Sequence, residues 1–319
     1  MIALQIERWL SMKKKRFIYT SILAGVIILG GCSTFTNSKE EPKKTTKELI
    51  EDQYFKSVQD YTAEEYSLPN GSETDKIAEE HKEEVHKAVK AYFKENYKTD
   101  VKVNNIVGAV DGASVSVESV GKPHFYTYAI IPVDKQTEEV DPSGVWSQEG
   151  QVETAIISGL YAWIFEEEFQ KLDQYLDEKV TQYPIVGIPN VANQNGVGNY
   201  HTTPYYKVVI YGGSVEEKLL APYLDNPNRS KEEWAKMLEG ESIDPSMVAT
   251  LIQLYMEEPD AEPSKEIFNE VVSGLSEMEG LALGQYGFIL HDNTINKSSG
   301  QNTKDNSLER TYPDDIIKD

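Results

Sequence analysis

The sequence predicts an α+β fold in which helices pack on a mainly antiparallel sheet, preceded by a signal peptide and a flexible tether. A helix-period stripe of apolar residues is followed by short strands of two-residue period, and strands and helices do not alternate regularly. Hydrophobic residues make up 39% of the 319 positions, enough to build a core. The predicted globular region spans 71–290, as one domain or as two subdomains divided near residue 145.

The amino-terminal segment is typical of an exported protein. Four consecutive cations at 13–16 precede thirteen uncharged, mostly apolar residues at 17–29. As a helix this run would be about 20 Å long, short of the ~30 Å hydrocarbon core, so it favours a signal peptide over a permanent transmembrane helix. We expect residues 1–31 to be removed on export and translation to start at Met12.

The residues Leu29-Gly30-Gly31-Cys32 resemble the lipobox of bacterial lipoproteins. In that family the cysteine sulfur receives a diacylglycerol and a peptidase cuts before it. An apolar residue such as Leu29 fills a subsite, and small Gly30 and Gly31 let the peptidase approach. The resemblance implies that Cys32 attaches the protein to the extracytoplasmic face of the cell membrane through a diacylglyceryl anchor. Because Cys32 is the only cysteine, no intramolecular disulfide and no cysteine nucleophile are expected.

The net charge of the chain limits the classes of partner that we expect it to bind. The formal net charge of −22 repels phosphate backbones and anionic headgroups, so we expect neither a nucleic-acid partner nor direct binding to lipid surfaces. Residues 32–70 are expected to hold the lipidated cysteine and a polar tether that lifts the domain off the membrane. An extracellular protein and a cell-wall polymer remain as candidate partners.

The first half of the globular region is predicted to contain one helix and three strands. Ser72 is a candidate helix N-cap, with Asp75 three residues later, and apolar residues recur at helical spacing to about Tyr97. Asp111-Gly112 is a favoured hairpin turn. The predicted strands are 101–110, 113–118 and 125–131.

The second half is predicted to be mostly helical. Residues 151–180 are expected to form one long, largely buried helix that ends before Pro184. Further helices are predicted at 215–223, 231–239 (capped by Ser230), 245–257 and 264–279, and strands at 205–212 and 286–290. The polar segment 291–319 is expected to be a disordered tail.

The connection 187–204 is the candidate ligand site. Loops of this length inside compact domains are uncommon and often functional. Its amides, tyrosine and histidine could contact a glycan or a peptide through Asn190, Asn193, Asn195, Tyr200 and His201. The alternative is a connector, eased by glycines, that has no binding role.

None of the candidate catalytic, metal-binding or cofactor-binding motifs has the residue types and spacing that its chemistry requires. His81 and His86 are five residues apart and point in different directions on a helix, and His81 is expected to pack in the core. The glutamate run at 166–168 is expected to be a solvated face. Asp225 begins a stretch without the glycine of an EF-hand, which indicates a turn. We therefore predict no cofactor and no metal ligands, and we assign no catalytic residue.

The stretches 57–62 (SVQDYT), 200–203 (YHTT) and 211–213 (YGG), together with the lipobox, resemble a family of uncharacterised lipoproteins from low-GC Gram-positive bacteria, classed as a domain of unknown function. The resemblance implies membrane attachment and no assigned activity. Our hypothesis is a non-enzymatic surface lipoprotein that binds or scaffolds an extracytoplasmic partner. The alternative is an envelope-acting hydrolase with an unrecognised carboxylate or serine site. A solute receptor would need a two-lobed fold with a cleft, which the order of the segments disfavours.

Overall fold

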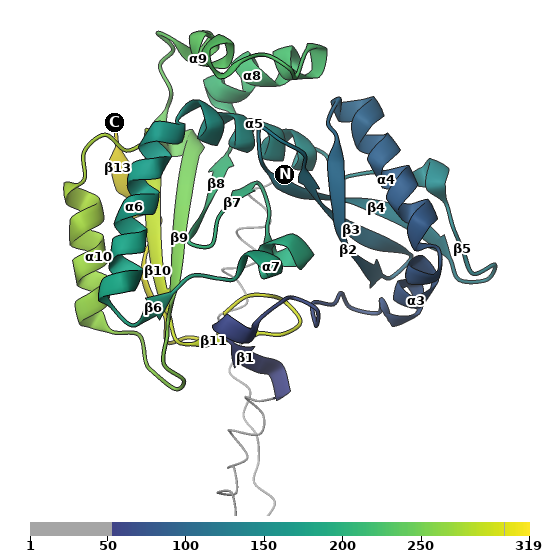
Figure 1. Ribbon diagram of the computed structural model, residues 1–319, viewed down its shortest axis with the longest axis horizontal. Coiled ribbons are helices and arrows are strands. Elements are labelled where there is room, and N and C mark those ends of the chain that lie inside the picture. Colours follow the sequence, from purple (N-terminus) through teal and green to yellow (C-terminus); the bar gives the residue numbers. More distant parts are fainter. Residues whose placement is uncertain (1–52, 303) are drawn as a thin grey trace, which may run out of the picture. The chain divides into compact units, whose positions relative to one another are not determined.

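The first sheet of the computed structural model, which describes residues 53–302 and 304–319, is antiparallel and has the strand order β2-β3-β4-β5. Its apolar face packs against α3 and α4, which lie along its outer side (Figure 1). The elements are α3 Ser72–Glu80, α4 Lys82–Tyr97, β2 Val101–Ala109, β3 Gly112–Ser119, β4 Tyr126–Asp134 and β5 Glu139–Val140. The three predicted strands and the hairpin turn at Asp111-Gly112 are confirmed.

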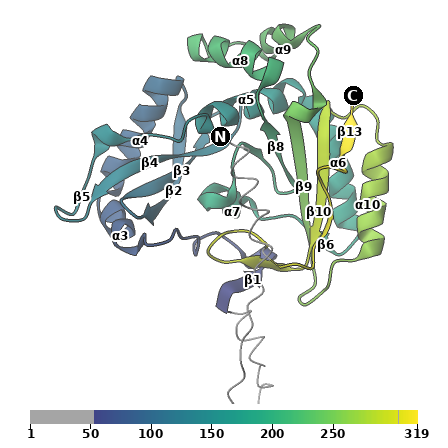
Figure 2. The same ribbon diagram turned by 180° about the vertical axis from the view of Figure 1, so that it is seen from behind.

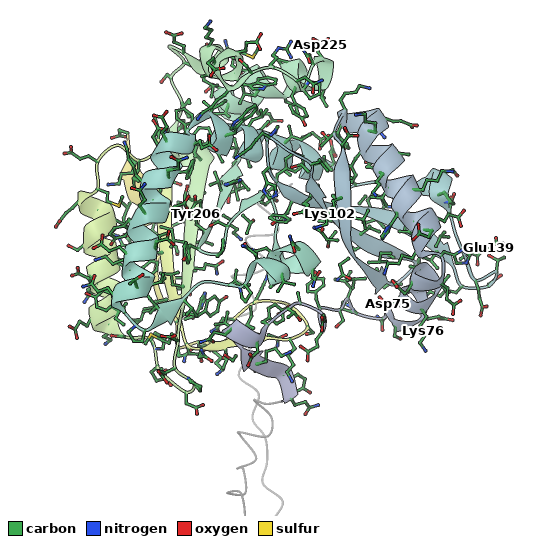
Figure 3. The ribbon with its side chains drawn as sticks, in the orientation of Figure 1. Asp75, Lys76, Lys102, Glu139, Tyr206 and Asp225 are labelled. Carbon is green, nitrogen blue, oxygen red and sulfur yellow. The ribbon has the colours of Figure 1, made fainter. Side chains whose placement is uncertain are left out.

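The helix predicted over 72–97 is divided at His81. This histidine is partly exposed and its Nε2 lies 3.0 Å from the carbonyl oxygen of Glu138, so the prediction of a core histidine is wrong. The N-cap of α3 is Gly71 rather than Ser72. Asp75, marked in Figure 3, instead accepts a hydrogen bond of 2.8 Å from the backbone N–H of Gly108, which fastens α3 to β2.

The second sheet has the order β12-β10-β9-β8-β7, with β13 paired to β10 and β6 paired to β9. Strands β9 and β10 are parallel, and α10 connects them. The strands are β6 Ile185–Val186, β7 His201–Thr202, β8 Tyr206–Ile210, β9 Val248–Met256, β10 Gly284–His291, β12 Leu308–Arg310 and β13 Ile316–Lys318. The fold is therefore α+β with mainly antiparallel pairing, as predicted.

The helices of the second half are α5 Gln151–Ile164, α6 Glu166–Gln182, α8 Gly213–Asp225, α9 Lys231–Leu238 and α10 Lys265–Glu277. Helices α6 and α10 cover one face of this sheet, whereas α8 and α9 pack on α5 (Figure 1). Both ribbon views place α6 and α10 on the same side of the sheet (Figures 1 and 2). Phe169 of α6 stacks on Tyr206 of β8, and Phe268 of α10 stacks on Phe288 of β10. The single helix predicted over 151–180 is two helices, divided at Phe165.

The segment predicted as a helix at 245–257 is instead the strand β9. Its residues alternate between buried and partly buried from Val248 to Leu254, and it pairs with β8 on one side and β10 on the other. A short apolar run fits a buried strand and a buried helix equally well by its composition. The neighbouring strands therefore decided its conformation.

The polar segment after His291 is ordered into strands, so the prediction of a disordered tail over 291–319 is wrong. Its first strand, β11 Thr294–Asn296, pairs with β1 Phe55–Ser57. A small second core, which includes Val58, Tyr61 and Ile295, packs beside this pair. The part of the predicted tether that includes 55–63 therefore belongs to the folded unit.

The turn that begins near Asp225 leads into α9 as predicted. The Ser230 hydroxyl accepts a hydrogen bond of 3.3 Å from the backbone N–H of Glu233, and the Glu233 carboxylate accepts one of 2.7 Å from the backbone N–H of Ser230. This reciprocal pair is a capping box. Glu166 of the predicted solvated run forms ion pairs with Lys122 and Lys231.

Helix α5 connects the two sheets through the main core. The Ser158 hydroxyl accepts a hydrogen bond of 3.1 Å from the backbone N–H of Ile210 and donates one of 2.6 Å to the carbonyl of Thr154. The main core has buried residues from both sheets, and the described residues belong to one compact unit. Among the described residues, no helix has the length and apolar character needed to cross a membrane. The predicted signal peptide, the lipobox with Cys32 and the tether up to residue 52 lie outside the described residues.

Candidate functional site

A cleft of about 700 Å³ lies between the two large sheets. Ser116 of β3 and Tyr128 of β4 line one side of it, and Lys207 of β8 and Gln253 of β9 line the other. A third part of its wall comes from the connection 187–204, which the sequence indicated as a candidate ligand site. The order of the segments did not predict a cleft between two sheets.

The strand periodicity places polar side chains in this cleft. On β3, Val115 and Val117 are buried in the main core, so Ser116 between them points to the opposite face. On β8, Tyr206 and Val208 are core residues, so Lys207 also points away from the helices. The cleft is therefore formed by the two sheet faces that the helices do not cover.

A second hollow, of about 930 Å³, lies along the β4–β5 hairpin. Apart from Asp111, its lining comes from the single segment 132–141. The cleft between the sheets, by contrast, brings together residues from distant parts of the sequence. Binding sites are typically assembled in that way, so the cleft is the stronger candidate.

Of the asparagines that were predicted for the ligand loop, Asn193 lines the cleft, whereas Asn190 and Asn195 do not. Asn193 lines the cleft, and its amide donates to the carbonyl of Thr203 at 3.2 Å. Asn195 is held in the fold, because its amide donates to the carbonyl of Thr62 at 2.8 Å. Asn190, at the start of the short helix α7 Asn190–Ala192, is exposed.

Tyr200 and His201 were also predicted as ligand residues, but their contacts hold the connection 187–204 in the fold. Tyr200 pairs through its backbone with β4, and Nδ1 of His201 lies 3.0 Å from the carbonyl oxygen of His124. The rings of Phe169 and Tyr206 lie beside the imidazole of His201, with centroids 6.5 Å away in each case. Burial lowers the pKa of His201 to about 4, so this histidine is neutral at physiological pH. The loop contributes other polar residues to the cleft: Asn199, Thr202 and Thr203.

A histidine and a serine from the predicted tail region also line the cleft. Nδ1 of His291, at the end of β10, lies 2.7 Å from the hydroxyl oxygen of Ser307. Nε2 of His291 lies 3.3 Å from the amide nitrogen of Gln253 on the neighbouring strand. Burial lowers the pKa of His291 to about 4, so its ring is neutral. The sequence signal for these residues was weak, because Ser307 lies in a polar stretch without periodicity.

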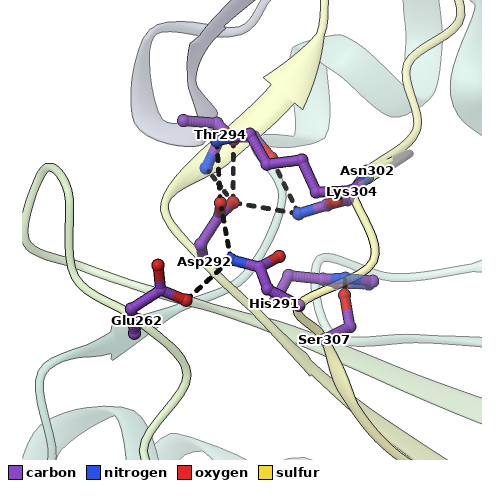
Figure 4. Close-up of polar contacts among 8 residues, drawn as sticks. Glu262, His291, Asp292, Thr294, Asn302, Lys304 and Ser307 are labelled. Atoms are coloured by element: carbon purple, nitrogen blue, oxygen red, sulfur yellow. Dashed lines mark hydrogen bonds and ion pairs between the residues drawn. The ribbon is translucent and has the colours of Figure 1, made fainter. Parts of the chain in front are cut away.

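A polar network around Asp292 holds this region of the chain in place (Figure 4). One carboxylate oxygen of Asp292 accepts hydrogen bonds from the backbone and hydroxyl of Thr294, and from the amide of Asn302. The other oxygen accepts from Lys304 at 2.9 Å and from Asn306 at 3.3 Å. Burial opposes ionisation, but the hydrogen bonds from Lys304 and Thr294 and the charge of Lys304 lower the pKa of Asp292 below its ordinary value. The segment that carries Ser307 is thus fastened to the end of β10.

The charged groups of the cleft are few. The described residues of its lining include one carboxylate, Glu309, and two lysines, Lys207 and Lys304. A pair of converging carboxylates, which would favour the predicted alternative of an acid–base hydrolase, is not among the described lining residues. Among the described residues, no group of three or more metal-ligating side chains is placed to hold a metal ion.

Comparison with known proteins gives a family and a fold. No curated protein matches the chain. A crystal structure of a DUF1672 family protein from Staphylococcus aureus is similar, with a TM-score of 0.67 and 17% sequence identity, over 80% of this chain and 96% of that chain. The family described as "Protein of unknown function (DUF1672)" matches residues 48–318. Because this match covers most of the sequence, the chain belongs to the DUF1672 family.

Proposed function

We propose that this protein is a non-enzymatic extracytoplasmic binding protein, anchored to the membrane through Cys32, and that it binds a polar ligand such as a peptide or a glycan in the cleft. The observation that carries the proposal is the cleft itself, which is lined by hydroxyl, amide and aromatic side chains on two uncovered sheet faces. Ligand sites are concave and combine apolar surface with a few placed polar groups.

The aromatic side chains of the cleft support this class of ligand. Tyr128 and Tyr205 line its two sides, and each combines a flat apolar ring with a hydroxyl group. The hydroxyl of Tyr128 donates to the side-chain oxygen of Gln148 at 3.0 Å, and that of Tyr205 donates to Asp177 at 2.9 Å. Both rings are therefore held in position before a ligand binds, which reduces the entropic cost of binding.

A substitution that fills the cleft tests the binding role. We would replace Ser116 by tryptophan and compare the variant with Ser273→Trp on the exposed face of α10. Retention of peptide mixtures and of solubilised cell-wall fragments by the full chain is measured by mass spectrometry. The proposal expects the parent and Ser273→Trp to retain the same molecules and Ser116→Trp to lose them. Equal retention by all three proteins, or retention by none, would reject it.

The anchor is tested separately from the cleft. Cells that express the full chain are grown with radiolabelled palmitate, and the protein is recovered from membranes and medium. We expect the label to enter the parent protein, and Cys32→Ser to be unlabelled and released from the membrane, because the serine oxygen cannot form the thioether. A serine variant that stays equally attached would contradict the proposed anchor.

Hydrolysis at Ser307 is the second candidate function, favoured by the 2.7 Å contact between Ser307 Oγ and His291 Nδ1 in the cleft. In such a step His291 takes the hydroxyl proton while Oγ attacks an ester carbonyl, and the alcohol leaves with that proton. However, the amide of Gln253 donates to Nε2, so the neutral ring carries its proton on Nδ1 and donates to Ser307. Catalysis would require the opposite tautomer, with the amide oxygen of Gln253 turned toward Nε2.

A fluorophosphonate probe distinguishes this second candidate from simple binding. A hydrolase would be labelled at Ser307, and the label would disappear in Ser307→Ala but persist in Ser299→Ala, a second serine of the cleft. The proposal of a non-enzymatic binding protein expects no labelling in any of the three proteins. Labelling at Ser307 would therefore replace the binding function by a hydrolytic one.

A further inference from the structure

Lys207 is a lysine in the wall of the cleft, on strand β8 of the second sheet. Its position in β8 pairs with Leu251 of β9 on one side and with Thr202 of β7 on the other. The side chain points to the cleft face, because its neighbours Tyr206 and Val208 belong to the core. A cation is therefore fixed on a sheet face that an occupant of the cleft would contact.

Lys207 has no ion pair or side-chain hydrogen bond with any residue of 53–302 or 304–319. Glu309, the carboxylate among the described residues of the cleft lining, lies on β12. Three strand-to-strand intervals separate β12 from β8, so the two strand backbones are about 14 Å apart. The other lysine of the lining, Lys304, is 2.9 Å from the buried carboxylate of Asp292. Positive charge without a fixed counter-ion is thus concentrated at Lys207, in a protein whose net charge is −22.

We propose that Lys207 is the anchoring residue for a carboxylate group of the ligand, such as the carboxyl terminus of a peptide or the acid group of a sugar. This inference rests on the proposed binding function of the cleft and deepens it. An ammonium group donates up to three hydrogen bonds and attracts an oxyanion as a point charge. A nearby polar side chain that would complete the site is Gln253, whose amide carries two N–H donors.

The charge of the cleft favours a carboxylate over a phosphate. One unpaired lysine balances a single negative charge, whereas phosphate sites usually combine several cations or a bidentate arginine. Glu309 and the acidic surface would further disfavour a dianion. We therefore expect a ligand with one acid group and otherwise neutral polar groups.

Desolvation supports the same inference. Burial lowers the pKa of Lys207, because its charged form has lost water without gaining a counter-ion. A buried cation without a partner is unfavourable, and an incoming carboxylate would supply the missing interaction. The ammonium group of Lys207 would therefore gain more interaction energy from a bound anion than the ammonium group of an exposed lysine would.

Chemical protection tests the inference at the residue itself. The full chain is treated with formaldehyde and a borane reductant, both uncharged, and the methylation rate of each lysine is followed by mass spectrometry. We expect N-acetylalanine to slow methylation of Lys207 several-fold and N-acetylalanine amide to leave it unchanged. The exposed Lys236 on α9 should react at one rate under all conditions. Equal protection by acid and amide, protection by methyl phosphate alone, or no protection would each overturn the carboxylate anchor.

Variants test the same point without modifying the lysine. A mixture of peptides with free carboxyl termini and the same mixture with amidated termini are passed over the immobilised full chain. The parent should retain the free acids at least ~10-fold better, equivalent to ~1.4 kcal/mol. Lys207→Gln should lose this preference and Lys207→Arg should keep most of it, while Lys236→Gln should match the parent.

The outcomes separate this inference from the binding function on which it rests. If both mixtures are retained equally and Ser116→Trp abolishes retention, the cleft binds peptides and the role of Lys207 is rejected. If neither mixture is retained and N-acetylalanine gives no protection, the anchor is rejected at the residue itself. The proposed binding function is then decided by the cell-wall fragments, whose retention and loss in Ser116→Trp would preserve it.

Discussion

Tyr126 and Tyr200 exchange two backbone hydrogen bonds: the N–H of Tyr126 donates to the carbonyl of Tyr200 at 2.7 Å, and the N–H of Tyr200 donates to the carbonyl of Tyr126 at 2.8 Å. Tyr126 belongs to β4 of the first sheet. Tyr200 directly precedes β7 of the second sheet. The pair therefore ties the two sheets together beside the cleft, and it fixes the distance between the two walls there.

Replacing Tyr200 by proline should break this tie. Tyr200 has φ of +60°, in the left-handed region, which proline cannot adopt, and proline also lacks the N–H donor. We expect a loss of about 3 kcal/mol in the free energy of unfolding, measured by urea denaturation. Asparagine, which tolerates the left-handed region and keeps the donor, is the matched control. If Tyr200→Asn costs as much as Tyr200→Pro, the side chain rather than the backbone pair provides the stability.

Two histidines whose pKa values are lowered in the fold, His201 and His291, should make stability depend on pH. Burial lowers the pKa of both His201 and His291 to about 4 from an ordinary value of 6.5. Between pH 6.5 and 4 the unfolded chain therefore binds protons that the folded chain does not, and stability falls as the pH falls. Each histidine contributes a slope of up to about 1.4 kcal/mol per pH unit.

Urea denaturation of the full chain at a series of pH values checks this dependence. His291→Gln should reduce the slope between pH 6.5 and 4, and the double variant with His201→Gln should reduce it further. The slope is informative even when a variant is less stable overall, because it counts protons rather than contacts. An unchanged slope in the double variant would show that these histidines are not held neutral.

Replacing Asp292 by asparagine should destabilise the segment that carries Ser307. The side chain of Asp292 is only 8% exposed, and the substitution removes the carboxylate that pairs with Lys304. We expect a loss of about 3 kcal/mol, the lower end of the range for breaking a buried pair, because Lys304 is 22% exposed. Glu262→Gln, which alters only an exposed contact to Asn306, should cost less than about 1 kcal/mol.

The pH dependence of the Asp292 variant has a defined sign. Because the folded chain lowers the pKa of Asp292 below 3.8, its charge stabilises the fold above that pH, and the contribution is lost as the pH falls through the lowered pKa. The difference in unfolding free energy between the parent and Asp292→Asn should therefore shrink in acid below pH 3.8. A difference that grows in acid would contradict the depressed pKa.

Gly108 should not tolerate a side chain. A Cβ atom at Gly108 would lie 2.1 Å from the carbonyl oxygen of Gly71 and 2.3 Å from the backbone nitrogen of Asp75. Gly108→Ala should therefore force α3 away from β2. We expect it to lower the free energy of unfolding by at least about 1–3 kcal/mol, the range typical of overpacked cores. Gly121→Ala, which meets nothing within 4 Å and has only a positive φ, should cost about 1 kcal/mol. Thermal unfolding of both variants compares a steric collision with backbone strain.

The part of the ligand site that the sequence could indicate was the connection 187–204, because a long loop with amides and glycines stands out locally. Its assembly with Ser116, Gln253 and Ser307 could not be predicted, since these residues meet only when strands distant in the sequence pair. The sequence also could not show which loop amides face the cleft. Asn195 looked like a ligand residue, but a hydrogen bond to the carbonyl of Thr62 holds it in the fold.

Local patterns alone determined the hairpin at Asp111-Gly112 and the capping box at Ser230, because turn preferences and helix caps depend on residues within four positions of each other. Tertiary structure decided that Val248–Met256 is a strand and that the polar segment 294–318 forms three more. An apolar run satisfies a helix or a strand equally, and a polar segment becomes ordered only where other strands supply its hydrogen bonds. Tertiary structure also decided where the cleft and Lys207 lie, because both positions depend on which strands pair.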